Sequence, residues 1–458
     1  MHSDEARWLA VQRHPGETLR VALERSLRDA IASGALRPGL RLLSSRSLAL
    51  QLGVSRGVTT EAYEQLAAQG FLVNRVKAAP VVAAVALPPT PVRPRPRSRR
   101  PRFDLTATTP DVTLFPVRRW TAALVEAVRV APPAAYDYGD SRGELDLRQA
   151  LADHLGRTRG VVADPERIIV VNGAAQGINL LAQVLAGQGV RRIAVEDPSL
   201  DSQPQRIRLN GLEAVGQPVD GDGLVVDGVD AEAVVVTPAH QFPTGAVLSG
   251  ARRRQLLEWA RGRGATVIED DYDAEFRYDR EPVRALQGLD PDRVAYIGTA
   301  SKSLAPALRL AWVVVPEALT ERAEQIKHLL DVCSPVIDQR ALARFFTSGE
   351  YDRHVRRTRL IYQRRRDALV RAISRHLPDL AVEGVAAGVH LLLRLPVDAD
   401  DTAVAAAAEQ EGVRVMPLSR FGISRAPGPG LVIGYGRVHD RALEPAVVRL
   451  ARAMGLPG

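Results

Sequence analysis

The chain has 458 residues, enough for two or three domains, and its 46% hydrophobic content is ordinary for a globular protein. It contains no apolar run of about 18 residues, and its first eight residues carry acidic side chains, so we expect neither a membrane span nor a signal peptide. The single cysteine, Cys333, excludes an internal disulfide and favours a reducing, cytoplasmic setting.

The net charge of +8 is unevenly distributed. Residues 1–79 contain 11 basic and 7 acidic residues, residues 80–102 contain six arginines and no acidic residue, and the rest of the chain is close to neutral. A basic front end on a near-neutral body suggests a polyanionic partner for the front end only, although such charge runs are more often just solvated surface.

Lysine is rare in this chain. Of 61 basic residues only three are lysines, namely Lys77, Lys302 and Lys327. A lysine retained against such a bias towards arginine is a candidate for chemistry that a guanidinium cannot perform, such as imine formation. Chance retention is the plain alternative, so the count only ranks candidates.

Hydrophobic residues recur at helical spacing in the front end, and serines and glycines mark the helix ends. Ser44 or Ser45 precedes the second helix, and Ser55 precedes the third. The predicted elements are helices over residues 18–33, 44–52 and 55–69, followed by a wing strand over residues 71–76. Three helices with a tight turn before the third predict a helix-turn-helix whose third helix enters the major groove of DNA, with an ordinary helical bundle as the alternative.

Residues 88–102 read PPTPVRPRPRSRRPR, with six prolines and no apolar periodicity. This composition predicts an extended spacer of roughly 3 Å per residue, whose arginines could also contact DNA phosphates. We therefore divide the chain into a head over residues 1–79, a linker over residues 80–102 and a large domain over residues 103–458.

From residue 103 onward short apolar strands alternate with helical stretches, which predicts a mostly parallel sheet with helices on both faces. The predicted strands cover residues 167–172, 192–196, 233–237, 265–269 and 293–298. Ligands of such sheets bind at the carboxyl ends of the strands. The chemically distinctive residues of the large domain follow these ends.

Three segments carry the chemically distinctive residues of the large domain. Gly173–Gly177 opens a helix after the first strand and exposes backbone N–H groups, which alone is a weak phosphate signal. Glu269–Tyr272 ends the fourth strand, and Thr299–Arg309, with Lys302 between two serines, follows the fifth. An amine, a carboxylate, a hydroxyl donor and an anion cradle are what pyridoxal phosphate requires.

Two resemblances follow from these motifs. The head resembles the GntR-type winged helix through the segments Gly39–Ala49, Leu52–Arg56 and Ala62–Leu66. The large domain resembles the fold-type I aminotransferase-like domain of MocR-type regulators through Tyr138–Gly143, Val195–Pro198, Thr237–Gly245, Glu269–Tyr278 and Leu286–Pro291. The resemblance implies an α/β protein with a winged helix-turn-helix, a large sheet domain and a smaller C-terminal α+β subdomain.

The resemblance also implies a cofactor site. Lys302 would form a Schiff base with pyridoxal 5′-phosphate, Asp270 would pair with the ring nitrogen, and Tyr272 would hydrogen-bond the ring oxygen. The groups expected to hold the phosphate are Thr299, Ser301, Arg309 and the backbone of Ala174 and Ala175. The residues expected at the DNA surface are Ser44, Arg46, Ser55, Arg56, Thr59 and Lys77, and no metal is expected.

This chain departs from the family pattern at several positions. Leu200 stands where relatives offer an aromatic ring to the cofactor, which loses stacking of about 0.5–1.5 kcal/mol. The usual carboxylate-binding arginine near the last strand is missing; Arg420 in a Pro-Leu-Ser-Arg segment is the implied substitute, and Arg437 is a weaker alternative. In the head, the departures are Leu43 in place of proline, the reversed order Val58-Thr59, and a wing that reads Lys77-Ala-Ala-Pro80.

The resulting hypothesis is a cytoplasmic regulator that binds double-stranded DNA and senses pyridoxal phosphate or an amine or amino acid condensed with it. The resemblance implies a head-to-tail homodimer whose two heads recognise paired half-sites. Two alternatives stay open. One is an aminotransferase carrying a DNA-binding arm, and the other is a DNA-binding protein whose large domain only dimerises.

Overall fold

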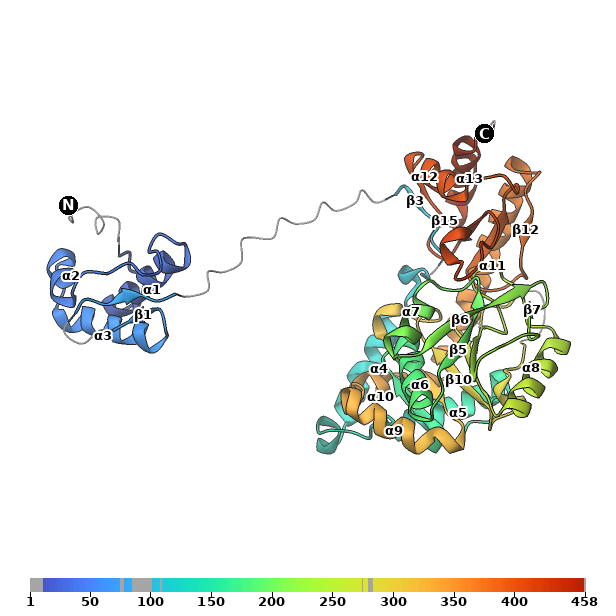
Figure 1. Ribbon diagram of the computed structural model, residues 1–458, viewed down its shortest axis with the longest axis horizontal. Coiled ribbons are helices and arrows are strands. Elements are labelled where there is room, and N and C mark those ends of the chain that lie inside the picture. Colours follow the sequence, from blue (N-terminus) through green and yellow to red (C-terminus); the bar gives the residue numbers. More distant parts are fainter. Residues whose placement is uncertain are drawn as a thin grey trace. The chain divides into compact units, whose positions relative to one another are not determined.

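The computed structural model of the chain divides into two compact units, residues 1–99 and residues 100–458, which are described separately (Figure 1). The residues that the structure describes are 11–74, 78–84, 101–107, 109–273, 275–278 and 283–456. Among these residues no helix is both long enough and apolar enough to cross a lipid bilayer.

The first unit has the helix-turn-helix and wing predicted from the sequence. Its elements are α1 (Leu19–Ala32), α2 (Ser45–Leu52), α3 (Arg56–Ala68), β1 (Leu72–Val73) and β2 (Val81–Val82). The Ser44 side chain accepts a hydrogen bond from the backbone N–H of Ser47 and so caps α2. Gly53 ends α2 in the left-handed conformation at φ +65°, which turns the chain into α3.

The wing is a short antiparallel pair in which Leu72 lies opposite Val82. Val81 also forms a bridge with Arg41, which ties the wing to the segment before α2. Strand β2 lies within residues 80–102, the segment predicted as linker, and its pairing makes it part of the head. Lys77 and residues 85–100 of the linker lie outside the described residues.

A small apolar core holds the head together. The Tyr63 hydroxyl donates to the carbonyl of Leu43 at 3.0 Å, which fixes α3 against the start of α2. The core side chains come from all three helices and the wing, and include Leu23, Leu27, Leu48, Ala62, Leu66, Leu72 and Val82.

The second unit is built on an eight-stranded sheet with the order β4-β11-β10-β9-β8-β5-β6-β7. The strands are β4 (Ile168–Val171), β5 (Arg192–Asp197), β6 (Glu213–Asp220), β7 (Gly223–Leu224), β8 (Ala233–Val236), β9 (Thr266–Asp271), β10 (Val294–Thr299) and β11 (Ala311–Val314). Strands β6, β5, β8, β9 and β10 run parallel, as the sequence predicted, whereas β11 is antiparallel to both of its neighbours. Strands β4, β8 and β11 are buried along their whole length, because helices cover both faces of the sheet.

Alternate residues of each strand pack into different helical layers. On one face Ala295, Ile297 and Ile268 pack in one apolar cluster with residues of three helices. These helices are α6 (Ala174–Gly187), α7 (Ser202–Leu209) and α9 (Glu317–Asp331).

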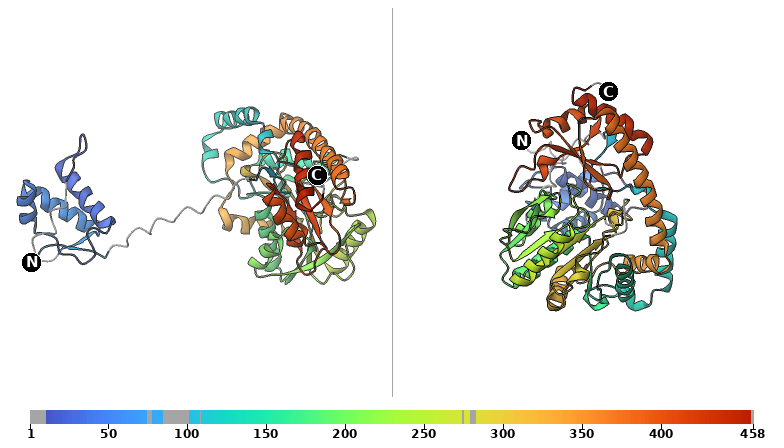
Figure 2. Two further views of the ribbon diagram at one scale, coloured as in Figure 1. Left: turned by 90° about the horizontal axis from the view of Figure 1, so that it is seen from above. Right: turned by 90° about the vertical axis from the view of Figure 1, so that its right-hand side faces the viewer.

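The opposite face is covered by a second layer of helices. Here Tyr296 and Trp312 pack in one cluster with residues of α4 (Val117–Val130), α5 (Leu145–Arg159) and α10 (Val336–Thr347). Further along the sheet, Val234 of β8 packs with residues of α8 (Gly250–Arg263). The helical layers flank the sheet in Figure 2.

A smaller subdomain follows at the C-terminal end of the chain. Its four-stranded sheet has the order β12-β13-β16-β15, with strands β12 (Val382–Glu383), β13 (His390–Arg394), β15 (Met416–Pro417) and β16 (Gly430–Gly434). Strand β3 (Phe103–Asp104) pairs in parallel with β14 (Val413–Arg414), so the segment that follows the linker belongs to this subdomain.

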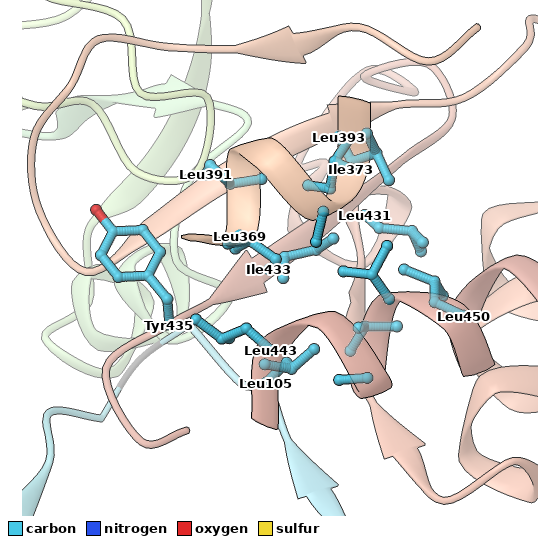
Figure 3. Close-up of a cluster of buried hydrophobic side chains, with 14 of the residues drawn as sticks. Leu105, Leu369, Ile373, Leu391, Leu393, Leu431, Ile433, Tyr435, Leu443 and Leu450 are labelled. Atoms are coloured by element: carbon cyan, nitrogen blue, oxygen red, sulfur yellow. The ribbon is translucent and has the colours of Figure 1, made fainter. Parts of the chain in front are cut away.

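One long helix joins the two subdomains. Helix α11 (Glu350–His376) begins in the core of the sheet domain with Tyr351 and ends in the core of the small subdomain with Leu369 and Ile373. Figure 3 shows this second core, in which Leu105, Leu391 and Leu431 join residues of α11. Helices α12 (Asp401–Gln410) and α13 (Asp440–Ala453) complete the subdomain.

Candidate functional site

Strand pairing brings three predicted site segments to one edge of the sheet. Ile297 of β10 lies opposite Asp270 of β9, so the carboxyl ends of these strands are neighbours. Ala311 of β11 pairs with both Thr299 of β10 and Val171 of β4. The loop after β4, the end of β9 and the loop after β10 therefore meet, and this edge is where sheets of this kind bind ligands.

The loop after β10 holds the first of these groups. The Thr299 hydroxyl donates to the Ser301 hydroxyl at 2.9 Å and accepts from the Ser301 backbone N–H at 3.1 Å, which fixes a tight turn. Lys302 follows that turn and is half-buried. Burial lowers the pKa of the Lys302 ammonium, although Asp273 and Asp270 oppose the effect. A lowered pKa increases the share of neutral amine, which is the form that attacks a carbonyl.

Asp270 faces this lysine from the end of β9. Burial, and then the neighbouring charge of Asp271, raise the pKa of Asp270 to about 7, against the nearby cations Lys302 and Arg206. Gln203 donates to its Oδ2 at 3.3 Å, and its Oδ1 is buried with no hydrogen-bond partner in the described structure. A buried carboxylate oxygen without a partner fits a protonated ring nitrogen, so the residues present fit pyridoxal phosphate at this point.

Gly173, Ala174, Ala175 and Arg309 form a group that we call the anion cradle, beside the loop that carries Lys302. The Arg309 guanidinium donates to the carbonyl of Asn172 at 2.6 Å, and a β-carbon at Gly173 would collide with that guanidinium. Gly173, at φ +91°, therefore allows the close approach that a larger residue would prevent. The backbone N–H groups of Ala174 and Ala175 begin α6 and precede its hydrogen-bond ladder, so they can receive a phosphate.

Tyr272 belongs to a buried polar cluster that sequence reasoning did not find. Its hydroxyl donates to the carbonyl of His240 at 2.9 Å and lies 3.2 Å from His240 Nδ1. His240 Nδ1 is in turn 2.9 Å from Asp273 Oδ2, and the ring centroids of His240 and His390 lie 4.7 Å apart. His240 stood in a motif quoted for the family resemblance, but nothing in its sequence neighbours indicated contact with Tyr272.

The same cluster has the composition of a cation site. Ligand atoms of His240, Asp273 and His390 lie within 4.8 Å of one another, and all three residues are buried. Burial lowers the pKa of His390 well below its usual value, because a charged imidazole would lose its solvation there. No metal was expected from the sequence, and the hydrogen bond between His240 and Asp273 explains their proximity without one.

Leu200 and the two candidate carboxylate-binding arginines have the following surroundings. Leu200 is half-buried and packs in one apolar cluster with Tyr272. Arg420 lies in a short 3-10 helix (Leu418–Phe421), is 54% exposed, and pairs with Asp201 at 2.8 Å. Arg437 pairs with Asp104 at 2.7 Å. Both arginines thus have acidic partners within the chain.

The loop after Arg420 is anchored to the sheet domain. Asp197, at the end of β5, accepts hydrogen bonds from the backbone N–H groups of Ile423 and Ser424 at 2.9 Å and from that of Arg425 at 3.2 Å. The Ser424 hydroxyl donates to the same carboxylate at 2.6 Å. Asp197 therefore fixes where the segment carrying Arg420 meets the sheet.

In the head, the structure exposes most of the predicted DNA-contacting residues. Arg46 and Arg56 line a hollow of about 450 Å³ between α2 and α3. Ser44 is exposed as the cap of α2, and the exposed Ser55 precedes α3 without a side-chain capping bond. This arrangement presents two guanidinium groups at the start of the predicted recognition helix.

Thr59 is a correction to the predicted DNA surface. Its side chain is fully buried, and its hydroxyl donates to the carbonyl of Ser45 at 2.8 Å and to that of Arg56 at 2.9 Å. Its position on α3 turns it towards α2 rather than towards solvent. Thr59 therefore joins the two helices, and we no longer expect it at the DNA surface.

Comparison with known proteins agrees with both halves of this structure. Residues 19–82 match the family described as bacterial regulatory proteins, gntR family, and residues 104–440 match aminotransferase class I and II. Among solved structures, kynurenine aminotransferase from Pyrococcus horikoshii matches with a TM-score of 0.72 and 25% identity, covering 78% of this chain and 91% of that one. The fold and site thus define a helix-turn-helix regulator with an aminotransferase-like domain.

Relatives that contain both the DNA-binding domain and the aminotransferase-like domain narrow the class of protein. The pyridoxine biosynthesis transcriptional regulator PdxR of Corynebacterium glutamicum is 32% identical over 455 residues, which is 98% of each chain. The probable rhizopine catabolism regulatory protein MocR of Rhizobium meliloti is 30% identical and covers 97% of this chain and 95% of its own length. The chain belongs to the MocR-type regulators, as its motifs indicated.

Proposed function

We propose that this regulator holds pyridoxal 5′-phosphate covalently at Lys302 and changes its DNA binding when the cofactor, or an amino compound bound to it, occupies the site. The observation that carries the proposal is the buried, unpartnered Oδ1 of Asp270 beside the Lys302 loop. Burying a carboxylate oxygen without a hydrogen-bond donor costs free energy of folding, and a bound cationic group would offset that cost.

The residues that would hold the cofactor divide by the part of it they contact. Lys302 would supply the amine and Asp270 would hold a proton at the ring nitrogen. Tyr272 would donate to the ring oxygen in place of the His240 carbonyl. Bound there, pyridoxal phosphate supplies an aldehyde that condenses with primary amines and a ring that withdraws electrons. The phosphate would be held by Thr299, Ser301, Arg309, Ala174 and Ala175, and Leu200 would pack against the ring.

The head would bind double-stranded DNA through α3. Arg46 and Arg56 are exposed at one hollow of the head, where guanidinium groups can reach guanine edges or phosphates. We propose that two chains form a head-to-tail homodimer, so that two heads recognise paired half-sites in the cytoplasm.

An amino acid effector would add a carboxylate to this site. Arg420 is the proposed partner for that carboxylate, and it would exchange its ion pair with Asp201 for the effector. The pair is half-exposed, so breaking it costs little, on the order of 1 kcal/mol or less. Arg437 is the weaker alternative, because it lies outside the Pro-Leu-Ser-Arg segment; it also has an acidic partner, Asp104.

An aminotransferase with a DNA-binding arm is the second candidate function. The grouping of Lys302, Asp270 and Tyr272 at one sheet edge favours it, as does the likeness to solved aminotransferases. The lack of an arginine in β16, at the position where such enzymes bind the substrate carboxylate, counts against it. Steady-state turnover with common amino and keto acid pairs separates the two candidates.

The absorbance spectrum of the purified full-length protein tests the cofactor site directly. We expect a band in the near-visible range that borohydride abolishes, with the reduced label on Lys302. Absence of any such band after loading with pyridoxal phosphate would leave a DNA-binding protein whose large domain only dimerises. The substitution of an aromatic ring by Leu200 is the feature that supports that alternative.

A further inference from the structure

Lys327 is a fully buried lysine that the proposed site does not use. It lies on α9 with no exposed surface, and its Nζ donates to Asp331 Oδ1 at 2.6 Å and to the Ser334 hydroxyl at 3.1 Å. Removing a charged group from water is costly, so a buried ammonium persists only where its partners are well placed. The chain uses arginine almost everywhere else, which makes this lysine more notable.

The partner of Lys327 connects it to the anion cradle. Asp331 Oδ2 accepts from Asn172 Nδ2 at 2.9 Å and from Gln176 Nε2 at 2.8 Å. These two residues stand immediately before and after Gly173, Ala174 and Ala175. One carboxylate therefore holds both ends of the segment whose N–H groups face the proposed phosphate.

Two further bonds make this segment rigid. Gln176 Oε1 accepts from the Asn172 backbone N–H at 2.6 Å, and the Asn172 carbonyl accepts from Arg309 at 2.6 Å. A disturbance at Asp331 would therefore move the first turn of α6 and the Arg309 guanidinium together. Ser334 adds a tie to the sheet, since its hydroxyl donates to the Val170 carbonyl at 3.3 Å.

The backbone next to Asp331 is strained. Val332 has a positive φ of +63°, which is rare for a β-branched residue, and the Cys333 N–H donates back to the Asp331 carbonyl at 2.6 Å. Such strain persists only where the surroundings over-determine the conformation. Here the turn directs the Asp331 carboxylate towards Lys327, Asn172 and Gln176.

We propose that Lys327 and Asp331 are positioning residues that set the geometry of the phosphate-binding segment without touching the cofactor. Lys327 neutralises and orients Asp331, and Asp331 orients Asn172 and Gln176. A compact ammonium with three donors suits this enclosed position, whereas the planar fork of arginine would need more space. The inference rests on the proposed function, because it assigns these residues to the phosphate of pyridoxal phosphate.

The test compares two ligands that differ only in the phosphate. Binding of pyridoxal phosphate and of pyridoxal to the cofactor-free full-length protein is measured for the wild type, Lys327→Met and Asp331→Asn. In both variants we expect the affinity for pyridoxal phosphate, divided by the affinity for pyridoxal, to fall about tenfold relative to the wild type. Pyridoxal itself should bind nearly as it does to the wild type. The ³¹P resonance of the bound phosphate should shift in the same variants.

Arg365→Met is the matched control. Arg365 is a buried cation that donates to Asp111 at 2.7 Å and to the Gly436 carbonyl at 2.5 Å, and none of these residues belongs to the anion cradle. This variant should lose stability but keep the affinity ratio and the ³¹P resonance. The conservative Asp331→Asn keeps the shape of a partly exposed side chain, so it carries the test if Lys327→Met does not fold.

The outcomes separate the inference from the proposed function. An unchanged affinity ratio in a folded Asp331→Asn protein would overturn the positioning role, whatever its effect on stability. If the wild-type protein bound neither ligand, the proposed cofactor function itself would be wrong. Equal loss of the ratio in Arg365→Met would also overturn the inference, since the effect would then be general.

Discussion

Folding and ligand binding place opposite demands on Asp270. Because burial raises its pKa from 3.8 to about 7, the folded cofactor-free chain keeps a proton at this residue that the unfolded chain has already lost between about pH 4 and pH 7. The free energy of unfolding contributed by Asp270 therefore falls as pH rises through this window, and stays low above it. A carboxyl group retained at a cost in stability is consistent with a ligand-binding role.

We expect Asp270→Asn to stabilise the cofactor-free protein, because the amide has the same shape and no charge to bury. The gain should grow with pH up to about 7 and reach about 4 kcal/mol above it, because each unit by which folding raises the pKa of Asp270 is worth about 1.4 kcal/mol. Denaturant unfolding of both proteins across this pH range measures the gain. In the cofactor-loaded protein Asp270→Asn should instead be less stable than the wild type, since asparagine cannot neutralise a protonated ring nitrogen. Equal stability at about pH 8 would contradict this account.

Lys302→Ala should abolish covalent attachment of the cofactor while leaving the fold intact, because the side chain is half-buried at the end of a strand rather than in a core. Borohydride reduction followed by peptide mapping checks this. Lys327 serves as the internal control, since Asp331 and Ser334 already engage its Nζ. Recovery of the label on Lys327 would show that the site is wrongly assigned.

Single residues differ in how far the sequence reveals them. Lys302 and Asp270 were identifiable because each lies at the carboxyl end of a strand, so their position in the fold follows from local pattern. Lys327 stands in the middle of a helix, and its carboxylate partner is held by Asn172 and Gln176 from a distant segment. Only the rarity of lysine pointed to it. Thr59 was misplaced because a residue in a recognition helix can face the neighbouring helix instead of DNA.

Among the single elements, α3 is the predicted recognition helix, which would contact DNA bases. Arg56→Ala should weaken specific operator binding by about 1–3 kcal/mol if Arg56 contacts a base, and should weaken all sequences alike with a smaller salt slope if it contacts only phosphate. Titrations of operator and unrelated DNA at several salt concentrations distinguish these outcomes. No loss on either DNA would remove α3 from the interface.

The buried Thr59 gives a contrasting prediction on the same helix. Thr59→Val removes the hydroxyl that joins α3 to the Ser45 carbonyl, so the head should lose about 1 kcal/mol of stability. The midpoint of the thermal unfolding transition of the head measures this loss. Operator affinity at a temperature where the head is folded, and its salt slope, should match the wild type. A loss of operator affinity in the folded Thr59→Val protein would return Thr59 to the DNA surface.

Elements with local signals were predicted better than those that depend on pairing. The three head helices were predicted within a few residues, because their signals are local. Ser44 and Gly53 bound α2 as capping residues, whereas Ser55 precedes α3 without a side-chain capping bond. The insertion of β11 between β10 and β4 was not predicted, since strand order depends on contacts between distant segments. That insertion nevertheless brings the anion cradle next to the Lys302 loop.

For the whole molecule, the proposed function requires the large domain to influence the head. An effector can shift DNA binding only by its differential affinity for two arrangements of the protein. Residues 88–102 are rich in proline and have no apolar stripe, so this segment should transmit little by itself. We therefore expect the coupling to run through direct contact between a head and a large domain, that of the partner chain in a head-to-tail dimer.

Adding pyridoxal phosphate to the cofactor-free protein should change operator affinity, and Lys302→Ala should blunt the response because the cofactor is no longer held covalently. Arg420→Ala should keep the cofactor response but weaken any response to an amino acid, since only the added carboxylate needs that arginine. Operator titrations of each protein, with and without cofactor at one fixed salt concentration, measure both effects. Identical curves for the two states, together with sustained transamination, would favour the enzyme over the regulator.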